Sequence, residues 1–217
     1  MKTDRHEAED GPSAPSTRPA LNRARIAAAA LALIDVNGLR AFSMRKLGAG
    51  LGVDPMTAYR YFEDQDALFD GVAELLLEEV DFDSLPWGGS WRAVAEQYCR
   101  RLRRTLLAHP HAVAVFATHP VRSPAATDAC ARLVDHVGAA GFGPARAGRI
   151  ARCLREFTVG HALSLAVLRP GAEDCAGDPA EQFDTGLTAM LDGFEPPHHR
   201  TRPQPAPRAD RPPRPPR

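Results

Sequence analysis

Apolar residues recur along the chain with helical spacing, and almost no segment alternates as a strand does. The first apolar stripe begins near Ile26 and stops at Asn37-Gly38, a typical end of a helix. Later stripes predict helices at about residues 65–80, 90–108, 111–118, 124–140, 144–168 and 179–194. The pattern therefore predicts an all-α fold.

Two short helices are predicted between residues 43 and 62. Ser43 can cap a helix that runs to about Leu51, and Asp54 followed by Pro55 combines an N-cap with proline at the first helical position. The pair can form a miniature core from Leu47, Leu51, Val53, Ala58 and Phe62. This spacing, with a Gly-containing turn, is that of a helix-turn-helix, whose second helix lies in the major groove of DNA.

That core leaves the opposite face of both helices exposed. A methionine or threonine methyl group can meet thymine, an arginine can reach guanine or phosphate, and a tyrosine hydroxyl can reach phosphate. A capped helix start flanked by basic residues can also hold a phosphate. The candidate DNA-binding residues are Ser43, Arg45, Lys46, Pro55, Met56, Thr57, Tyr59, Arg60 and Tyr61. Double-stranded DNA is the expected partner.

Charge divides the chain in a similar place. The 217 residues carry no net charge, but residues 21–62 hold six Arg or Lys against two acids, and residues 63–194 hold twelve Arg against nineteen acids. A basic head on an acidic body indicates a polyanion at one end only. We expect a disordered tail, a helix-turn-helix DNA-binding domain, a helical effector-binding and dimerisation domain, and a disordered Pro/Arg-rich tail, over residues 1–20, 21–66, 67–195 and 196–217.

Composition narrows the setting further. The four cysteines are widely spaced without a CxxC pair, and no apolar run suits a secretory signal or a membrane span. We therefore expect a cytoplasmic, nucleoid-associated protein without a membrane partner. The sequence holds no GxSxG, phosphate loop or HExxH, so we expect neither an enzyme nor a cofactor. The alternative function is a helical partner-binding protein with a vestigial helix-turn-helix, which the acidic run Glu63-Asp64-Gln65-Asp66 favours.

The segment AFSMRKLGAGLGVDPMTAYRYF, followed by ALFDGVAELLL, resembles the N-terminal domain of the tetracycline-repressor-type (TetR) transcriptional regulators. Later segments resemble their ligand-binding domain: SWRAVAEQYCRRLRRTLLAHP, THPVRSP, REFTVGHAL and FDTGLTAMLDGFE. The resemblance implies an all-α homodimer that represses transcription from a palindromic operator and releases it when a small molecule binds. Gln65 departs from the family, which often has a phosphate-contacting lysine near this position.

The resemblance also implies an effector pocket among the helices predicted between residues 90 and 168. Its candidate lining residues are Tyr61, Tyr98, Leu102, Phe116, His119, His136, Phe157 and His161. The same aromatic and leucine positions are compatible with an ordinary core, and His161 with a core or interface histidine. A metal site is not expected, because His109, His111 and His119 are spaced by two and eight residues, which suits no common site.

In the tetracycline-binding members, a histidine and a glutamate hold a magnesium–drug chelate. The resemblance places Val115 or Phe116 at the histidine and Ser164 at the glutamate, and these residues cannot support a hydrated Mg²⁺. It also places Tyr61 at a histidine that touches the drug. We therefore expect a small, mostly apolar organic effector that acts without Mg²⁺.

The last two predicted helices carry long apolar stripes. Two such helices from each protomer can build an isologous four-helix bundle. The candidate dimer-interface residues are Ile150, Leu154, Leu165, Phe183, Leu187, Met190, Leu191 and Phe194.

Overall fold

The computed structural model describes residues 20–119, 121–167 and 177–194, and within these ranges the fold is all-α, as predicted. Nine α-helices follow one another in this part of the chain: α1 (Arg23–Asn37), α2 (Met44–Leu51), α3 (Pro55–Ala58), α4 (Gln65–Glu78), α5 (Trp91–Ala108), α6 (Val113–Thr118), α7 (Pro124–Val137), α8 (Pro144–Val167) and α9 (Pro179–Gly193). The expected tails fall almost entirely outside the described residues, as does residue 168, the last one of the helix predicted at 144–168.

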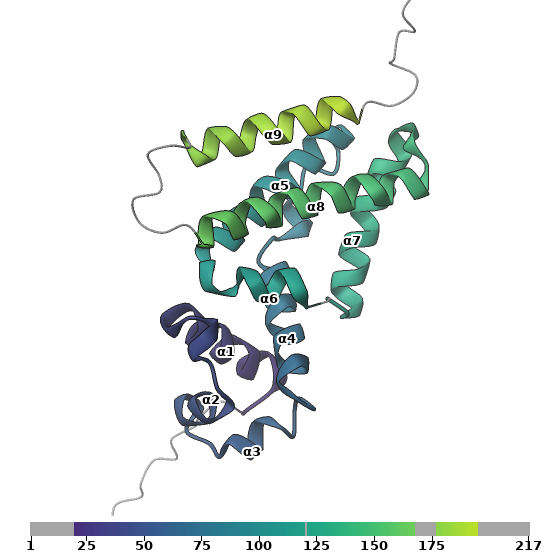
Figure 1. Ribbon diagram of the computed structural model, residues 1–217. Coiled ribbons are helices and arrows are strands. Elements are labelled where there is room, and N and C mark those ends of the chain that lie inside the picture. The colour runs from purple at the N-terminus through teal and green to yellow at the C-terminus, as the bar shows by residue number, and fades with distance from the viewer. Residues whose placement is uncertain (1–19, 120, 168–176, 195–217) are drawn as a thin grey trace, which may run out of the picture.

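The helices form two groups at opposite ends of the molecule, and α4 joins them (Figure 1). Helices α1 to α3 lie together at one end, and α5, α8 and α9 lie roughly alongside one another at the other end. Between them stand α6 and α7, while α4 runs from the first group towards the second. Helix α1 packs against α4, and α5 packs against α8, so that one continuous apolar core links both ends.

Several helices begin directly after a residue whose side chain caps the first turn. Ser43 and Asp54 accept hydrogen bonds from the backbone N–H groups three and two residues later, as the sequence predicts. Ser90 caps α5 in the same way. The segment after Asp54 is shorter than expected, because the α-helix ends at Ala58 and the chain continues as turns to Tyr61. Helix α7 likewise ends at Val137, and a wider turn (Gly138–Phe142) leads into α8.

The close packing of α2 on α3 depends on Gly48. A Cβ atom at this buried position would lie 2.9 Å from the Val53 carbonyl oxygen and 3.0 Å from the Pro55 nitrogen. Since any side chain would push the turn away, glycine is required for the short helix-turn-helix geometry.

Helix α9 packs on its own protomer, which corrects much of the predicted dimer interface. Five of the eight proposed residues are buried inside the protomer, namely Ile150, Leu154, Phe183, Leu187 and Leu191. The Phe183 ring stacks on Phe157 of α8 at 5.3 Å, which shows why the stripe faces inward. Leu165, Met190 and Phe194 remain partly exposed. The apolar stripes of α8 and α9 therefore build mainly the protomer core.

Candidate DNA-binding surface and effector pocket

The segment around α3 lies at the end of the molecule opposite α9 (Figure 1). Met56 is 67% exposed and Tyr59 is 39% exposed, although both are large apolar side chains. Arg60 is exposed beside them, while Pro55 and Thr57 are half-buried. On the inner side, Leu47, Ala58 and Phe62 of the predicted miniature core are buried, while Leu51 and Val53 are half-buried. Such an exposed face fits the readout of base edges and phosphates.

Basic side chains flank this face with different freedom to move. Arg45 and Arg60 are exposed and have no partner among the described residues. The Lys46 ammonium group donates a 2.8 Å hydrogen bond to the Ala41 carbonyl, while the Ser43 side chain caps α2. Arg45 is therefore the freer of the two adjacent cations for a phosphate.

Tyr61 is half-buried, and two contacts hold it against the segment that begins α1. Its hydroxyl donates a 3.0 Å hydrogen bond to the Leu21 carbonyl, and its own carbonyl accepts from Arg23. Arg23 also lies 4.2 Å above the centre of the Phe62 ring. Tyr61 thus ties the end of the helix-turn-helix to the start of α1, and it does not line the cavity described below. Its contact with DNA stays a prediction.

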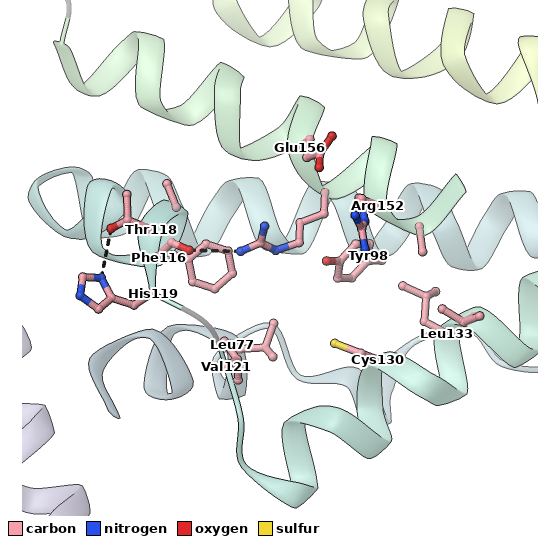
Figure 2. Close-up of a pocket in the computed structure, with 14 residues that line it drawn as sticks. Leu77, Tyr98, Phe116, Thr118, His119, Val121, Cys130, Leu133, Arg152 and Glu156 are labelled. Atoms are coloured by element: carbon pink, nitrogen blue, oxygen red, sulfur yellow. Dashed lines mark hydrogen bonds between the residues drawn. The ribbon is translucent and has the colours of Figure 1, made fainter. Parts of the chain in front are cut away.

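A cavity of about 520 Å³ lies between α5, α6, α7 and α8, with the last turn of α4 at one side (Figure 2). Its volume is in the usual range for small organic ligands. The cavity is lined by Leu77, Tyr98, Phe116, Ala117, Thr118, His119, Val121, Cys130, Leu133, Val134, Ala151, Arg152, Arg155 and Glu156.

Three of the eight predicted pocket residues, Tyr98, Phe116 and His119, line this cavity. The other five lie elsewhere. Leu102 is completely buried in α5, and His136 contacts the ring of Trp87 edge-on at 5.6 Å. Phe157 and His161 both pack on Phe183, because α9 covers that part of α8. Burial and the neighbouring arginine Arg103 lower the pKa of His161, which suits a neutral core histidine.

Sequence reasoning missed the charged part of the lining. Arg155 donates a 3.1 Å hydrogen bond from Nη2 to the Phe116 carbonyl, and its guanidinium lies 5.0 Å above the centre of the Phe116 ring. Arg152 and Glu156, from the same helix, also border the cavity. The one signal in the sequence was their spacing beside the apolar stripe of α8, which equally suits a solvent-exposed face.

Burial sets the protonation of the polar groups in the cavity. It raises the pKa of Tyr98 far above its usual value, so the phenol stays protonated at neutral pH. Burial also raises the pKa of the Cys130 thiol, while the positive charge of Arg155 opposes that rise. The cavity therefore combines neutral hydroxyl and thiol groups with fixed positive charge.

Of the positions implied for magnesium ligands, Phe116 lines the cavity, whereas Val115 and Ser164 do not. Val115 and Phe116 are completely buried, and the exposed Ser164 hydroxyl donates to the His161 carbonyl at 2.8 Å. Among the described residues, no group of three or more His, Cys, Asp or Glu is placed to hold a metal ion. His109 lies between Asp35 and Glu79, away from His119.

His119 joins the cavity to the first turn of α4. Its ring meets Phe69 edge-on at 5.4 Å between centres, and its Nε2 lies 3.8 Å from a carboxylate oxygen of Asp66. Phe69 in turn packs on Phe42, which precedes α2, at 5.1 Å. Contiguous side chains therefore run from the cavity wall to the helix-turn-helix.

Two family models match the chain. The one described as "Bacterial regulatory proteins, tetR family" covers residues 26–72, and the one described as "Tetracyclin repressor-like, C-terminal domain" covers residues 85–174. The tetracycline repressor protein class A from transposon 1721 of Escherichia coli is 31% identical over 174 residues, which cover 77% of this chain and 78% of the relative. The chain belongs to the tetR family of bacterial regulatory proteins.

Solved structures agree with this assignment. A tetR-family variant from Acinetobacter baumannii, in complex with minocycline, superposes with a TM-score of 0.73 at 26% identity and covers 81% of this chain and 97% of that one. BioQ with its double-stranded DNA operator superposes with a TM-score of 0.65 at 25% identity, covering 80% and 98%. The chain spans only 64% of the length of an HTH-type transcriptional regulator from Saccharopolyspora erythraea, with 31% identity, and 43% of another relative.

None of the helices that the structure describes is both long and apolar enough to cross a bilayer.

Proposed function

We propose that this tetR-family regulator is a repressor that binds a palindromic operator as a homodimer and releases it when a small organic molecule enters the cavity. The course of α4 carries the proposal. This helix begins at Gln65, directly behind the helix-turn-helix, and its last turn places Leu77 in the cavity wall. One rigid element thus contacts both the DNA-binding end and the ligand-binding end.

The DNA-binding half of the proposal rests on the exposed side chains of the recognition segment, residues 55–61. Met56, Tyr59 and Arg60 stand out from a helix-turn-helix whose own core is complete, so they are free for the major groove. The solved operator complex of BioQ, a structure with the same fold, supports this use of the surface. We assign residues 21–66 to DNA binding and residues 67–195 to the effector and the dimer.

The release half rests on the contacts of His119 and Leu77. Two recognition segments that read one face of DNA must be about 34–36 Å apart, or a multiple of that distance. A ligand that prefers a dimer with a different spacing weakens DNA binding by its differential affinity and by no more. Leu77 and His119 both line the cavity. Leu77 belongs to α4, and His119 contacts Phe69 of α4. A ligand in the cavity can therefore bias the position of α4.

We propose an organic effector that needs no Mg²⁺. Phe116, Leu133 and Val134 supply an apolar wall, and the residues at the implied magnesium positions offer no carboxylate or imidazole. The Acinetobacter neighbour is a complex with the organic molecule minocycline, which supports an organic effector for this chain.

We propose that the dimer forms through the outer faces of α8 and α9. Small or uncharged residues are exposed there, namely Gly160, Ser164, Thr185, Thr188 and Ala189, and Val167 at the end of α8 is 73% exposed. Their small size allows a second pair of helices to approach closely, in the isologous arrangement of a two-fold dimer.

The test is selection of double-stranded DNA from a random library with the full chain, followed by gel-shift titration at several salt concentrations. We expect an inverted-repeat sequence and an affinity whose logarithm falls linearly with the logarithm of salt concentration. Failure to enrich any sequence, with no salt-dependent shift, would contradict the proposal and favour a partner-binding protein with a vestigial helix-turn-helix.

A further inference from the structure

Arg155 introduces a positive charge into a largely apolar cavity. Its guanidinium is held from two sides, by the hydrogen bond to the Phe116 carbonyl and by the face of the Phe116 ring. No carboxylate of the described residues pairs with it. A guanidinium carries five N–H donors in a fixed fork, so most of its donors remain free for a ligand.

Arg152 adds a second positive charge on the same helix. It also has no ion-pair partner among the described side chains, and in Figure 2 it reaches towards Tyr98. Glu156 projects towards the other side of α8 in that view, away from Tyr98 and Phe116. The lining therefore has two arginines against one glutamate, and the glutamate is the least directed into the cavity.

The Tyr98 hydroxyl is the second independent observation. Tyr98 is only 3% exposed, and its hydroxyl makes no hydrogen bond to any described residue. Figure 2 shows this hydroxyl pointing into the space between Phe116 and Cys130. The hydroxyl is accessible from the cavity, so a ligand that places an acceptor there can take a hydrogen bond from it.

We propose that the effector is an aromatic or otherwise flat organic acid, whose anionic oxygen is bound by Arg155 and Arg152 and accepts a hydrogen bond from the Tyr98 hydroxyl. Its apolar body lies against Phe116, Leu133 and Val134. The inference deepens the mostly apolar effector considered above, and it rests on the proposed effector role of the cavity. A carboxylate and an acidic phenol or enol share this chemistry.

Arg155 also has a structural role that any test must separate from ligand binding. Its hydrogen bond satisfies the Phe116 carbonyl near the end of α6, where intrahelical partners run out. A truncated arginine could therefore destabilise the fold without any effect on ligand charge. Comparison of an acid with its neutral amide removes this ambiguity, because both probes see the same variant protein.

The probes are 2-naphthoate and anthraquinone-2-carboxylate, each paired with its primary carboxamide. Their affinities for the full chain are measured by calorimetry without DNA, for the wild type, Arg155→Met, Arg155→Lys, Arg152→Met and the control Arg149→Met. Arg149 is an exposed arginine of the same helix that does not line the cavity. Because no DNA is present, the result is independent of whether the protein proves to be a repressor, which the gel-shift experiment tests separately.

We expect wild type and Arg149→Met to bind each acid about tenfold to a hundredfold more tightly than its amide. Arg155→Met should lose most of that preference, and Arg155→Lys should keep part of it because the charge remains. If Arg155→Met does not fold, the preference must fall in Arg152→Met or Arg155→Lys. Equal affinity of acid and amide for the wild type, no binding of either acid, or a preference that survives in every cavity variant would each overturn the proposal.

Discussion

Asp35 of α1 and His109 at the end of α5 are joined by a 2.7 Å contact between Oδ2 and Nδ1, although 74 residues separate them in the sequence. The other ring nitrogen of His109 lies 3.1 Å from a carboxylate oxygen of Glu79, at the end of α4. His111 contacts the backbone carbonyl of Asp35 at 2.9 Å. Two histidines therefore link α1 to the segment after α5, and one of them, His109, is held between two acids.

This arrangement predicts a pH-dependent stability. Burial alone would lower the pKa of His109, but the hydrogen bond and charge of Asp35, and then those of Glu79, raise it above the ordinary value. Because the folded-state pKa is raised, the stabilisation is complete below about pH 6.5 and is lost as pH rises through the folded-state value. Thermal unfolding of the wild type and His109→Gln between pH 5.5 and 8.5 should show their difference in Tm shrinking as pH rises. A constant difference for His109→Gln would contradict the assignment.

Gly48 and Gly50 offer a matched pair of substitutions in α2. Gly48→Ala should destabilise the protein by about 1–3 kcal/mol, because its Cβ would press on the backbone of Val53 and Pro55. Gly50 is exposed and a Cβ atom there would meet open space, so Gly50→Ala should be neutral or stabilising by about 0.5 kcal/mol. Urea unfolding followed by circular dichroism measures both. Equal effects of the two substitutions would show that the turn relaxes freely.

We expect the two exposed arginines of the DNA-binding end to differ in what they contact: Arg60 a base and Arg45 a phosphate. Arg60→Ala should cost about 1–3 kcal/mol at the selected operator and relax sequence preference at one position. Arg45→Ala should weaken binding to all sequences and reduce the salt slope by about one unit. Lys46→Ala should have the smaller effect of the two, since its ammonium group is already bound to Ala41. Operator titrations over a range of salt concentrations test this, and unchanged affinity in both arginine variants would remove the surface from DNA binding.

The outer face of α8 predicts how the dimer can be broken without unfolding the protomer. Gly160 is exposed, and no atom lies within 4 Å of a Cβ built there, so Gly160→Arg should leave the protomer folded. In a dimer that buries this face, the same arginine should give monomers that bind a palindromic operator weakly. Gly50→Arg, on α2, is the control that should remain dimeric. Sedimentation velocity decides, and a dimeric Gly160→Arg would place the interface elsewhere.

Local chemistry made the helices predictable, while the pocket depended on long-range packing. Asp54 and Ser90 mark helix starts because a side chain and a backbone amide two or three residues apart suffice to form the cap. Phe116 and Phe157 look alike in the sequence, but α9 covers Phe157 and leaves Phe116 at the cavity. Periodicity identifies an apolar face without identifying the element that covers it.

Arg155 and Tyr61 show the same limit for polar side chains. An arginine beside an apolar stripe is expected in solvent, and only the position of the Phe116 carbonyl and ring brings Arg155 into the cavity. Tyr61 directly follows the exposed Arg60, yet its hydroxyl donates a hydrogen bond to the carbonyl of Leu21, which is 40 residues away in the sequence. Such partners come from tertiary contacts, which a single sequence does not reveal.

The contacts of His119 predict which side chain transmits ligand binding to α4. His119 lines the cavity and contacts Phe69 and Asp66, whereas its neighbour Thr118 lines the cavity but hydrogen-bonds only to Ala114 and His119. We expect His119→Ala to reduce the factor by which a bound probe acid weakens operator affinity, a factor typically about 5- to 150-fold in allosteric proteins. Thr118→Ala should keep that factor.

The coupling factor comes from operator titrations with and without saturating acid, so a simple loss of acid affinity in His119→Ala does not imitate it. The factor should be the same in EDTA and in millimolar Mg²⁺, because Val115, Phe116 and Ser164 cannot supply magnesium ligands. A factor that needs Mg²⁺ would show that another set of residues binds a chelate. An unchanged factor in His119→Ala would move the coupling to Leu77, which reaches the cavity from α4 itself.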